Sequence, residues 1–274
     1  MSFGSGLPVG VIGVLNVSPE SFHAGSVHAA PDDLLATALA MVDAGAALID
    51  VGARSTAPYG TSSVGDRDER ERLARAVEAL TAKVPVPISA DTARPGPARA
   101  ALDAGARVIN DVSGLRDPEV ATLVRERGAG AILMAFPDDG PSPLAPVATV
   151  KTLLHSALER ARAAGIPDER VVLDPGIGFF RGERVPWDEW DATVLAGLAE
   201  LEAVGRPLCV GVSRKSFLGA ILGRARTEDR LAGSLAATAL AVWNGASLVR
   251  THDVAETVDA VRIAERIRSA GRTL

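Results

Sequence analysis

Short apolar runs rich in β-branched residues alternate along this chain with longer stretches of helical period, and this alternation restricts the possible folds more than any other feature. Eight runs have the length and composition of buried strands, at residues 11–15, 47–51, 86–90, 107–109, 130–134, 171–173, 208–212 and 247–249. The stretches between them place an apolar stripe on one face and charged residues on the other, at residues 32–44, 66–83, 97–104, 118–127, 147–164, 187–204, 230–243 and 255–270. A repeated β–α order of this kind is typical of parallel sheets.

Acidic residues and glycines mark the expected helix ends. We expect helices to start at the capping residues Asp32, Asp117 and Asp188. We expect them to stop at glycines that tolerate the left-handed conformation, namely Gly45, Gly105, Gly128, Gly165, Gly205 and Gly245. Eight such units in 274 residues predict one (β/α)8 barrel, the TIM-barrel fold, as a single domain over residues 1–274 with residues 1–8 as a short N-terminal tail. An open doubly wound sheet is the alternative, but no Gly-x-Gly-x-x-Gly turn follows the first strand.

Bulk composition excludes several classes of partner. A net charge of −5 disfavours nucleic acid, because no basic stripe offsets repulsion from the phosphates. No apolar segment approaches the roughly 20 residues that span a bilayer, so no membrane role is expected. Cys209 is the only cysteine, which rules out an intrachain disulfide and fits a reducing, cytoplasmic location. A small anionic ligand stays compatible, since it needs only local cations.

Polar side chains gather where the predicted strands end. In a closed parallel barrel, active sites lie at the carboxyl ends of the strands. Reading only those positions selects Asn16, Asp50, Arg54, Ser55, Thr56, Asp91, Thr92, Asn110, Asp111, Asp174, Arg214, Lys215, Ser216, Arg250 and His252. So many polar groups beside a core need partners. A ligand rich in hydrogen-bond donors and acceptors would supply them, which predicts an enzyme with one convergent site.

Two groups of these residues suit a nitrogen heterocycle. Asp91, Asn110 and Asp174 follow three different strands, and two carboxylates with one amide match a ring edge that alternates N–H donors and nitrogen acceptors. For any one of them alone, a helix cap or a loop hydrogen bond is an equally simple reading. The phrase Ser-Arg-Lys-Ser at residues 213–216 brings two cations and two hydroxyls to a strand end, which suits an electron-rich ring or an anionic group.

Other strand-end residues suit a phosphate and its metal ion. An amide oxygen from Asn16 is the type of ligand that Mg²⁺ accepts, although an asparagine that merely forms a turn is the alternative. Arg250 and His252 are two residues apart on the eighth strand and both donate to phosphate oxygens, unless they are only a surface arginine and an internally bonded histidine. Zinc-type His/Cys spacing and a Gly-x-Ser-x-Gly elbow are both missing from the sequence.

Taken together, seven phrases make the chain resemble the dihydropteroate synthases, the pterin-binding barrel enzymes of folate biosynthesis, over nearly its whole length. In order they are GVLNVSPESF at 13–22, IDVG at 49–52, SADT at 89–92, INDV at 109–112, LDPGIGF at 173–179, SRKSF at 213–217 and VRTHD at 249–253. The resemblance implies a transferase that condenses 6-hydroxymethyl-7,8-dihydropterin diphosphate with p-aminobenzoate, giving 7,8-dihydropteroate and pyrophosphate. It also implies Mg²⁺ and, by analogy, a homodimer.

The resemblance further implies roles for individual residues. The pterin would be held by Asp91, Asn110, Asp174 and Lys215, and the pyrophosphate by Asn16, Thr56, Arg250 and His252, with Asn16 also facing the metal. The p-aminobenzoate pocket would be bordered by Ser216, Phe179 and Pro58. The residues expected to act in catalysis are Lys215, Arg250, His252 and Asp91.

Departures from the family pattern lie in the loops. Ala57 stands where an arginine is expected after Thr56, the first loop reads His-Ala-Gly-Ser at 23–26 and lacks the usual aspartate, and Phe180-Arg181 replaces Gly-Lys. An alternative therefore stays open: a divergent pterin-binding protein with a different amine acceptor or no turnover. A methyl-transferring pterin protein is a further rival, against which the Ser-Arg-Lys-Ser phrase counts.

Overall fold

Eight parallel strands form the centre of the molecule. The computed structural model describes residues 4, 7–18, 31–55, 63–137, 141–142, 145–182 and 184–271. The strands follow the order β6-β5-β4-β3-β2-β1-β8-β7, and a bridge between Leu173 and Leu208 brings the two outer strands together. Their bounds are β1 Gly10–Asn16, β2 Leu48–Gly52, β3 Ile88–Asp91, β4 Val108–Asp111, β5 Gly130–Met134, β6 Val171–Asp174, β7 Cys209–Val210 and β8 Leu248–Thr251. The predicted (β/α)8 barrel is confirmed.

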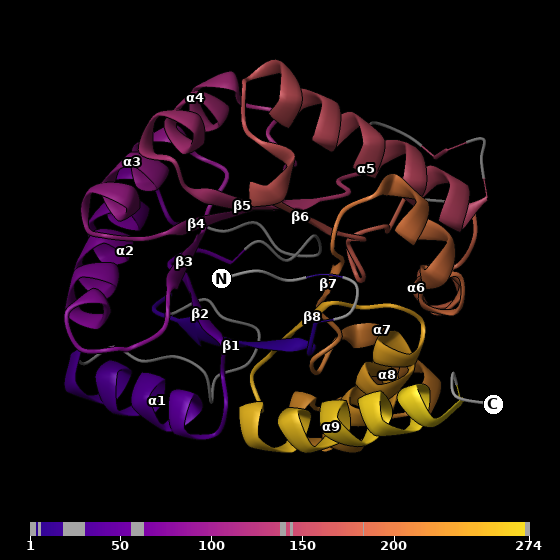
Figure 1. The fold of residues 1–274 in the computed structure, drawn as a ribbon. Helices are drawn as coiled ribbons and strands as arrows, with labels where there is room; N and C mark the ends of the chain where they lie inside the picture. Colours follow the sequence, from indigo (N-terminus) through magenta and orange to yellow (C-terminus); the bar gives the residue numbers. More distant parts are fainter. Residues whose placement is uncertain are drawn as a thin grey trace.

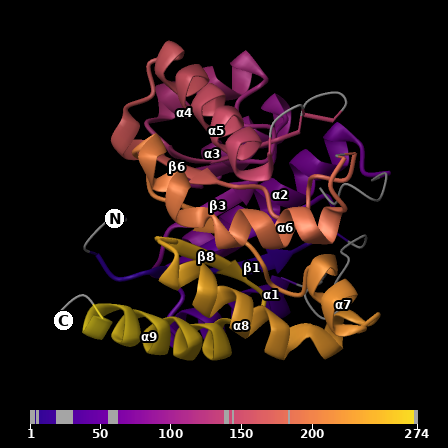
Figure 2. The same ribbon diagram turned by 90° about the vertical axis from the view of Figure 1, so that its right-hand side faces the viewer.

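Helices surround this barrel (Figure 1). Among the described residues they are α1 Pro31–Asp43, α2 Asp66–Thr81, α3 Pro95–Asp103, α4 Pro118–Arg127, α5 Pro146–Ala163, α6 Trp187–Ala196, α7 Ser216–Leu222, α8 Leu231–Trp243 and α9 Val254–Gly271, with short 3-10 turns η2 Asp168–Arg170, η3 Leu198–Val204 and η4 Thr227–Arg230. Figure 2 shows α7, α8 and α9 following one another along one side, and α6 lies beside α7. None of the described helices combines the length and apolar character needed to cross a lipid bilayer.

Two predicted elements differ from the structure. The helix expected over 187–204 is split into α6 and η3 at Gly197, where a side chain would lie 2.6 Å from Cγ2 of Val147 and collide with α5. The sequence reading also missed α7, a helix of seven residues, because so short a segment shows little periodicity. The strand predicted over 208–212 is reduced to the two residues of β7.

The predicted helix ends are mostly correct. All six glycines expected to stop helices have positive φ angles, from 59° at Gly128 to 108° at Gly105. The Asp117 carboxylate accepts a hydrogen bond of 2.8 Å from the Glu119 amide and so caps α4. The capping predictions for Asp32 and Asp188 are wrong, because each lies inside its helix rather than before it.

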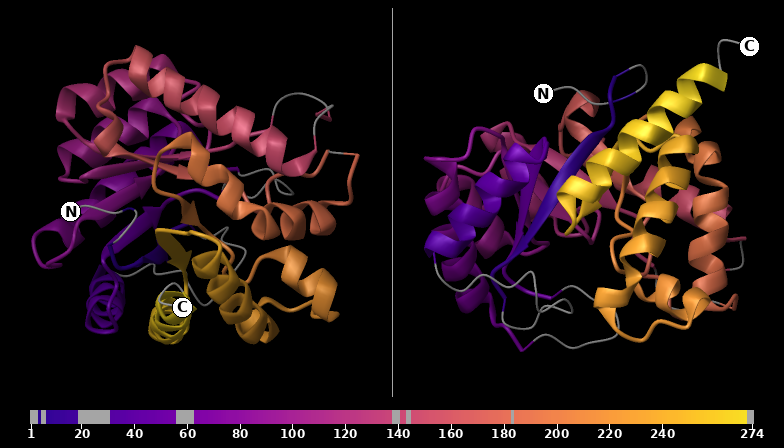
Figure 3. Two further views of the ribbon diagram at one scale, coloured as in Figure 1. Left: turned by 45° about the vertical axis from the view of Figure 1, so that its right-hand side comes forward. Right: turned by 90° about the horizontal axis from the view of Figure 1, so that it is seen from below.

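The barrel interior is closed at one level by an apolar plug. Ile12, Leu48, Ile132, Cys209 and Leu248 pack together and are almost fully buried. Strand side chains alternate between the two faces of the sheet, so residues two positions after the plug again face inward. Four of these inward positions carry polar residues of the site: Asp50 and Arg250 follow Leu48 and Leu248, and Asn110 and Asp174 follow Val108 and Val172, which pack against the plug. All eight strands run in the same direction, so these side chains meet at one end of the barrel. Figure 3 shows β1, in indigo, running through the molecule.

Candidate active site

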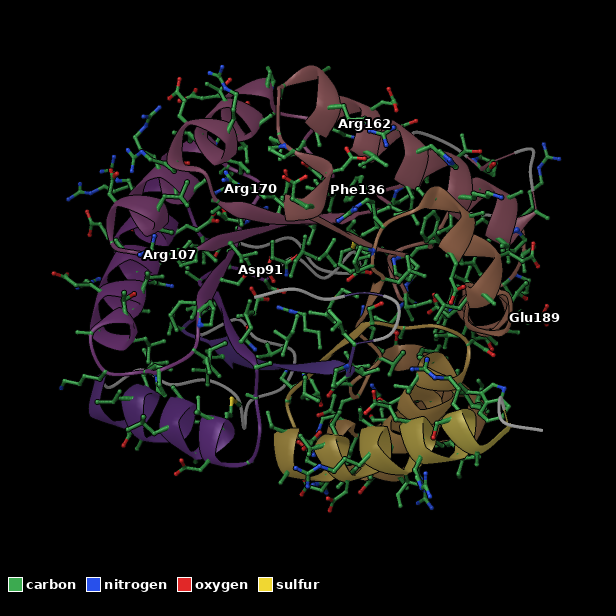
Figure 4. All side chains as sticks on the ribbon, in the orientation of Figure 1. Asp91, Arg107, Phe136, Arg162, Arg170 and Glu189 are labelled. Carbon is green, nitrogen blue, oxygen red and sulfur yellow. The ribbon has the colours of Figure 1, made fainter. Side chains whose placement is uncertain are left out.

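One half of the site is a cluster of side chains from β2, β3, β4 and β8. Arg250 donates from Nε to Oδ2 of Asp50 at 2.6 Å and from Nη2 to Oδ2 of Asp91 at 2.8 Å. Asn110 donates from Nδ2 to the same Asp50 oxygen at 2.9 Å. Figure 4 shows Asp91 inside the ring of helices. Four strand ends are thus tied together through one arginine and one aspartate.

Within the described residues, this cluster leaves two carboxylate oxygens without a partner. Asp50 is fully buried and Asp91 is 7% exposed. Among the residues that the structure describes, Oδ1 of each accepts no hydrogen bond. Buried polar atoms are nearly always paired in native proteins. An unsatisfied acceptor on Asp91, at the open end of the barrel, therefore marks a place where the N–H group of a ligand would bind.

Burial controls the protonation of this half. It raises the pKa of Asp91 to about 7, while the positive charge of Arg250 opposes the rise. Burial disfavours the charged form of Arg250, but the carboxylates of Asp50 and Asp91 outweigh it and raise the arginine's pKa above its ordinary value. The arginine is consequently a fixed cation, and Asp91 is the group whose charge changes near neutral pH.

The other half of the site lies on β6 and on the loop after β7. Oδ1 of Asp174 accepts a hydrogen bond of 2.7 Å from the Gly176 amide, and burial raises the pKa of this carboxyl while nearby Lys215 opposes the rise. Burial lowers the pKa of Lys215, with Asp174 acting in the opposite sense. The Lys215 ammonium donates to the carbonyl of Ile177 and lies 5.0 Å from the centroid of the Phe179 ring.

The backbone turn at Arg214 directs the two cationic side chains of the Ser-Arg-Lys-Ser phrase to different sides. Arg214 has a φ of 56°, which is unusual for a residue with a side chain. Its guanidinium forms two bonds to the Asp253 carboxylate, at 2.9 and 2.6 Å, and a third to the Thr227 carbonyl at 3.0 Å. The expectation that both cations face a ligand is wrong for Arg214. Its side chain anchors the loop, and the turn directs Lys215 toward Asp174.

The residues predicted to hold the pyrophosphate lie around the same opening. His252 accepts or donates through Nδ1 at 3.0 Å from the Ser213 hydroxyl, which fixes the imidazole to the turn after β7. Asn16 ends β1, and a side chain placed at Gly52 would lie 3.3 Å from its Oδ1 and 3.7 Å from Cβ of Asp91. Arg250 commits Nε and Nη2 to carboxylates, so within the described part of the chain Nη1 is the nitrogen left for another acceptor. Two predicted residues, Thr56 and Pro58, fall outside the described part of the chain.

Asp191, on α6, is a buried charged residue that the sequence reading missed. It is 1% exposed, and its Oδ1 accepts a hydrogen bond of 2.8 Å from the Gly178 amide, which fixes the loop under Lys215. Burial raises the pKa of Asp191 to about 6, against the Gly178 hydrogen bond and the charge of Lys215. A signal was present in the sequence, because an aspartate between Trp190 and Val194 interrupts an otherwise apolar helix face.

The chain is similar to known proteins over nearly its whole length. A family model described as "Pterin binding enzyme" matches residues 12–252. The dihydropteroate synthase of Mycobacterium leprae is 41% identical over 277 residues, covering 96% of this chain and 95% of that protein. A dihydropteroate synthase from Coxiella burnetii, solved with pteroic acid, has a TM-score of 0.86 and 36% identity, covering 96% and 94% of the two chains. The enzyme of Xanthomonas albilineans, solved with 4-aminobenzoic acid, has a TM-score of 0.86, 38% identity and the same two coverages.

Proposed function

The chain belongs to the pterin-binding enzyme family, and from this premise we propose that it is a dihydropteroate synthase. It condenses 6-hydroxymethyl-7,8-dihydropterin diphosphate with p-aminobenzoate to give 7,8-dihydropteroate and pyrophosphate. The observation that carries this proposal is the convergence of Asp91, Asn110 and Arg250 with Asp174 and Lys215 at one end of the barrel. Relatives solved with pteroic acid and with 4-aminobenzoic acid support the same pair of ligands.

The pterin binds between the two halves of the site. Asp91 and Asp174 accept hydrogen bonds from the ring and amino N–H groups, Asn110 reads the ring edge with its amide, and Lys215 donates to a ring acceptor. Oδ1 of Asp91 accepts no hydrogen bond from the residues that the structure describes, and a ligand donor would remove the cost of an unsatisfied buried oxygen.

In the reaction, the nitrogen of the arylamine attacks the exocyclic methylene carbon of the pterin as the carbon–oxygen bond to the diphosphate breaks. The amine loses a proton and pyrophosphate leaves. Arg250 through Nη1 and His252 stabilise the charge that develops on the leaving group. Phe179 and Ser216 border the arylamine.

We propose Mg²⁺ as the metal ion, with the Asn16 amide oxygen as a protein ligand. Mg²⁺ keeps several waters and takes few protein ligands beside substrate phosphates. That habit fits the described residues, which contain no cluster of three or more His, Cys, Asp or Glu side chains suited to a metal. When bound, the ion would offset charge on the diphosphate. Asn16→Ala should raise the Mg²⁺ concentration needed for half-maximal activity, and an unchanged requirement would remove Asn16 from the metal site.

We also propose that two copies associate through α7 and α8. A groove of about 490 Å³ lies between α6, α7 and α8 and is lined by apolar side chains, including Leu195, Phe217 and Ile221. Ile221 is 59% exposed and Leu240 61%, an apolar surface of the kind that marks interaction sites. Light scattering should give the mass of a dimer, and Leu240→Glu should give that of a monomer. A cytoplasmic location remains part of the proposal, supported by the single cysteine, Cys209, which lies buried in β7.

One assay tests the activity. The protein is incubated with the pterin diphosphate, p-aminobenzoate and Mg²⁺, and pyrophosphate release is followed together with dihydropteroate formation. Release that requires both organic substrates supports the synthase. Tight pterin binding without product would instead support a pterin-binding protein with no turnover, and product with another amine only would change the acceptor.

A further inference from the structure

A buried carboxylate of α2, the helix that lies beside β3 in Figure 1, is close to the pterin half of the site. Glu69 is 1% exposed and holds the first of the inward positions of α2, which continue with Leu73, Ala76, Val77 and Leu80. An apolar side chain suits such a position, whereas an ionised carboxyl that has left water needs charged or hydrogen-bonding partners. The proposed reaction gives Glu69 no role, so its burial calls for another explanation.

The two oxygens of Glu69 bind the turn that follows β3. Oε1 accepts a hydrogen bond of 2.6 Å from the hydroxyl of Thr92, a residue that is also 1% exposed. Oε2 accepts a bond of 3.1 Å from Nη1 of Arg94, and the same nitrogen donates to the Val64 carbonyl at 3.3 Å. The first turn of a helix also favours a negative charge, and Glu69 lies in the first turn of α2. One carboxylate thus ties the start of α2 to the turn after β3.

This turn begins at the residue next to Asp91. Asp91 is the last residue of β3, where its partner in the neighbouring strand β4 is Asn110. After it, the Thr92 amide donates to the Asn110 carbonyl at 3.1 Å, and the Thr92 hydroxyl accepts from the Arg94 amide at 3.3 Å. Local opening is easiest at the ends of elements. The bond between Thr92 and Glu69 therefore acts where the backbone of Asp91 would otherwise be least restrained.

We propose that Glu69 is a positioning residue for pterin recognition: through the Thr92 hydroxyl and the Arg94 guanidinium, it holds the end of β3 in the place that pterin binding requires. With 1% of its surface exposed and both oxygens bonded, Glu69 acts through its partners and does not touch the ligand. The inference rests on the proposed function only for the identity of the ligand, a pterin.

The chemistry of this cluster requires an acceptor at both ends of the side chain. A hydroxyl and a guanidinium both point their hydrogens at Glu69, and the ionised carboxylate accepts from both at once. A glutamine at this position has nearly the same shape, but it presents an N–H group to one of the two donors. One of the two bonds is then lost, and the turn after β3 loses one of its anchors.

Glu69 also acts on Asp91 through its charge. Burial is the main cause that raises the pKa of Asp91, and Arg250 opposes this rise. The carboxylates of Asp50, Glu69 and Asp111 add to it. Removing the charge of Glu69 would therefore ease the ionisation of Asp91, which opposes the loss expected from a displaced turn. Measurements above about pH 8, where Asp91 is ionised in either case, isolate the effect of position.

The test is the affinity for 6-hydroxymethyl-7,8-dihydropterin, the proposed substrate without its diphosphate, measured by calorimetry at about pH 8.5. Glu69→Gln should raise the Kd by about 3- to 10-fold, the effect of losing one hydrogen bond. Thr92→Val removes the hydroxyl but keeps the shape of the side chain, and it should raise the Kd by a similar factor. Thr92→Ser retains the hydroxyl and should keep the Kd within about twofold of that of the unaltered protein.

Glu71→Gln is the matched control. Glu71 lies on the same helix, but its side chain is 46% exposed and pairs with Arg67. Its replacement should leave the pterin Kd unchanged. Thermal denaturation shows whether each variant is folded at the assay temperature, and the pair of Thr92 variants keeps the test decisive if Glu69→Gln does not fold. An unchanged Kd in Thr92→Val, or equal weakening by Thr92→Val and Thr92→Ser, would overturn the proposal.

Kinetics separate a displaced turn from a loosened barrel. In the synthase assay, Glu69→Gln should raise the KM for the pterin diphosphate, while the KM for p-aminobenzoate changes by less than about twofold because that substrate binds at the other half of the site. Equal rises in both KM values would contradict the positioning role.

Failure of the synthase function is a separate result. An unaltered protein that binds the pterin but forms no product refutes the proposed activity, and the calorimetric test of Glu69 then still decides on its role. Product formation with a pterin Kd that neither Glu69→Gln nor Thr92→Val changes refutes the positioning role alone. An unaltered protein that does not bind the pterin refutes both.

Discussion

The two halves of the barrel mouth are built in different ways. On β2, β3, β4 and β8, the side chains of Asp50, Asp91, Asn110 and Arg250 form a network of direct hydrogen bonds centred on Asp50 and Arg250. After β6 and β7, the chain turns through positive φ angles at Gly176, Gly178 and Arg214, and the Lys215 ammonium donates a hydrogen bond to a backbone carbonyl. The first half is therefore a rigid, charge-paired wall, and the second takes its shape from backbone turns. Substitutions in the first half should therefore mainly lower the free energy of unfolding. Substitutions that alter the geometry of the second half should mainly weaken ligand binding.

The largest effect is expected from removing the centre of the rigid half. Asp50→Ala takes away the acceptor shared by Arg250 and Asn110 and leaves a partly buried arginine, 22% exposed, with one carboxylate. We expect the free energy of unfolding to fall by about 3–5 kcal/mol, as for other broken buried ion pairs. Lys215→Met, in the other half, should change stability by less than about 1 kcal/mol, because burial already disfavours the charged amine. Urea denaturation of the two variants measures the difference, and similar losses in both would show that the two halves do not differ in this way.

The same difference decides what the sequence alone was able to predict. Asp91, Asn110, Asp174 and Arg250 lie on strands, so the two-residue alternation and the common direction of the strands are enough to bring them together. The roles of Arg214 and Asp191 depend on a left-handed turn and on which helix face packs under a loop. Neither follows from a local pattern: Arg214 shares its phrase with Lys215 yet faces the opposite way, and Asp191 lies 13 residues from the glycine that it fixes. The eight strands and the glycine stops were predictable because they repeat, whereas α7 and the break at Gly197 occur once.

A second prediction concerns the buried carboxyl beneath the turn-built half. Asp191 has a pKa of about 6 in the folded protein against 3.8 as its ordinary value, so the folded state binds the proton more tightly. Its burial therefore lowers stability progressively as pH rises from about 4 to 6, and the full penalty is present above pH 6. Asp191→Asn keeps an oxygen for the Gly178 amide and removes the charge. It should stabilise the protein at pH 8 by up to about 3 kcal/mol, since each pKa unit corresponds to about 1.4 kcal/mol.

That gain should disappear below about pH 4, where Asp191 is protonated in both states. Thermal denaturation across this pH range follows the effect. Glu189→Gln, on the same helix and pointing outward in Figure 4, is the control and should leave the profile unchanged. A gain that does not depend on pH would show that the carboxylate charge is not what destabilises this half.

A third prediction concerns the protonation of Asp91, in the rigid half, and its effect on pterin affinity. If the pterin donates N–H groups to Asp91, it binds the ionised form of this carboxylate. Below the pKa of about 7, the Asp91 carboxyl of the free protein is protonated and must release its proton when the pterin binds. Pterin affinity should then be constant above about pH 8 and fall by up to tenfold per pH unit below 7, equivalent to about 1.4 kcal/mol per unit. Isothermal titration calorimetry in buffers of different ionisation enthalpy measures both the affinity and the proton released. Affinity that does not vary between pH 6 and 8 would contradict the role of Asp91 as an acceptor.

The smallest effect is expected where the backbone shapes the second half. Gly178 has a φ of +87°, and a side chain there would lie 3.0 Å from Cδ of Lys215. Gly178→Ala should cost about 1 kcal/mol from the left-handed conformation alone, and it should also displace Lys215 and weaken pterin binding several-fold. Gly182→Ala, in the same loop, meets no atom of the described residues within 4 Å and should change neither stability nor affinity. If both variants weaken binding equally, general stiffening of the loop explains the loss. If only Gly178→Ala does so, the position of the lysine is set by the space that this glycine leaves.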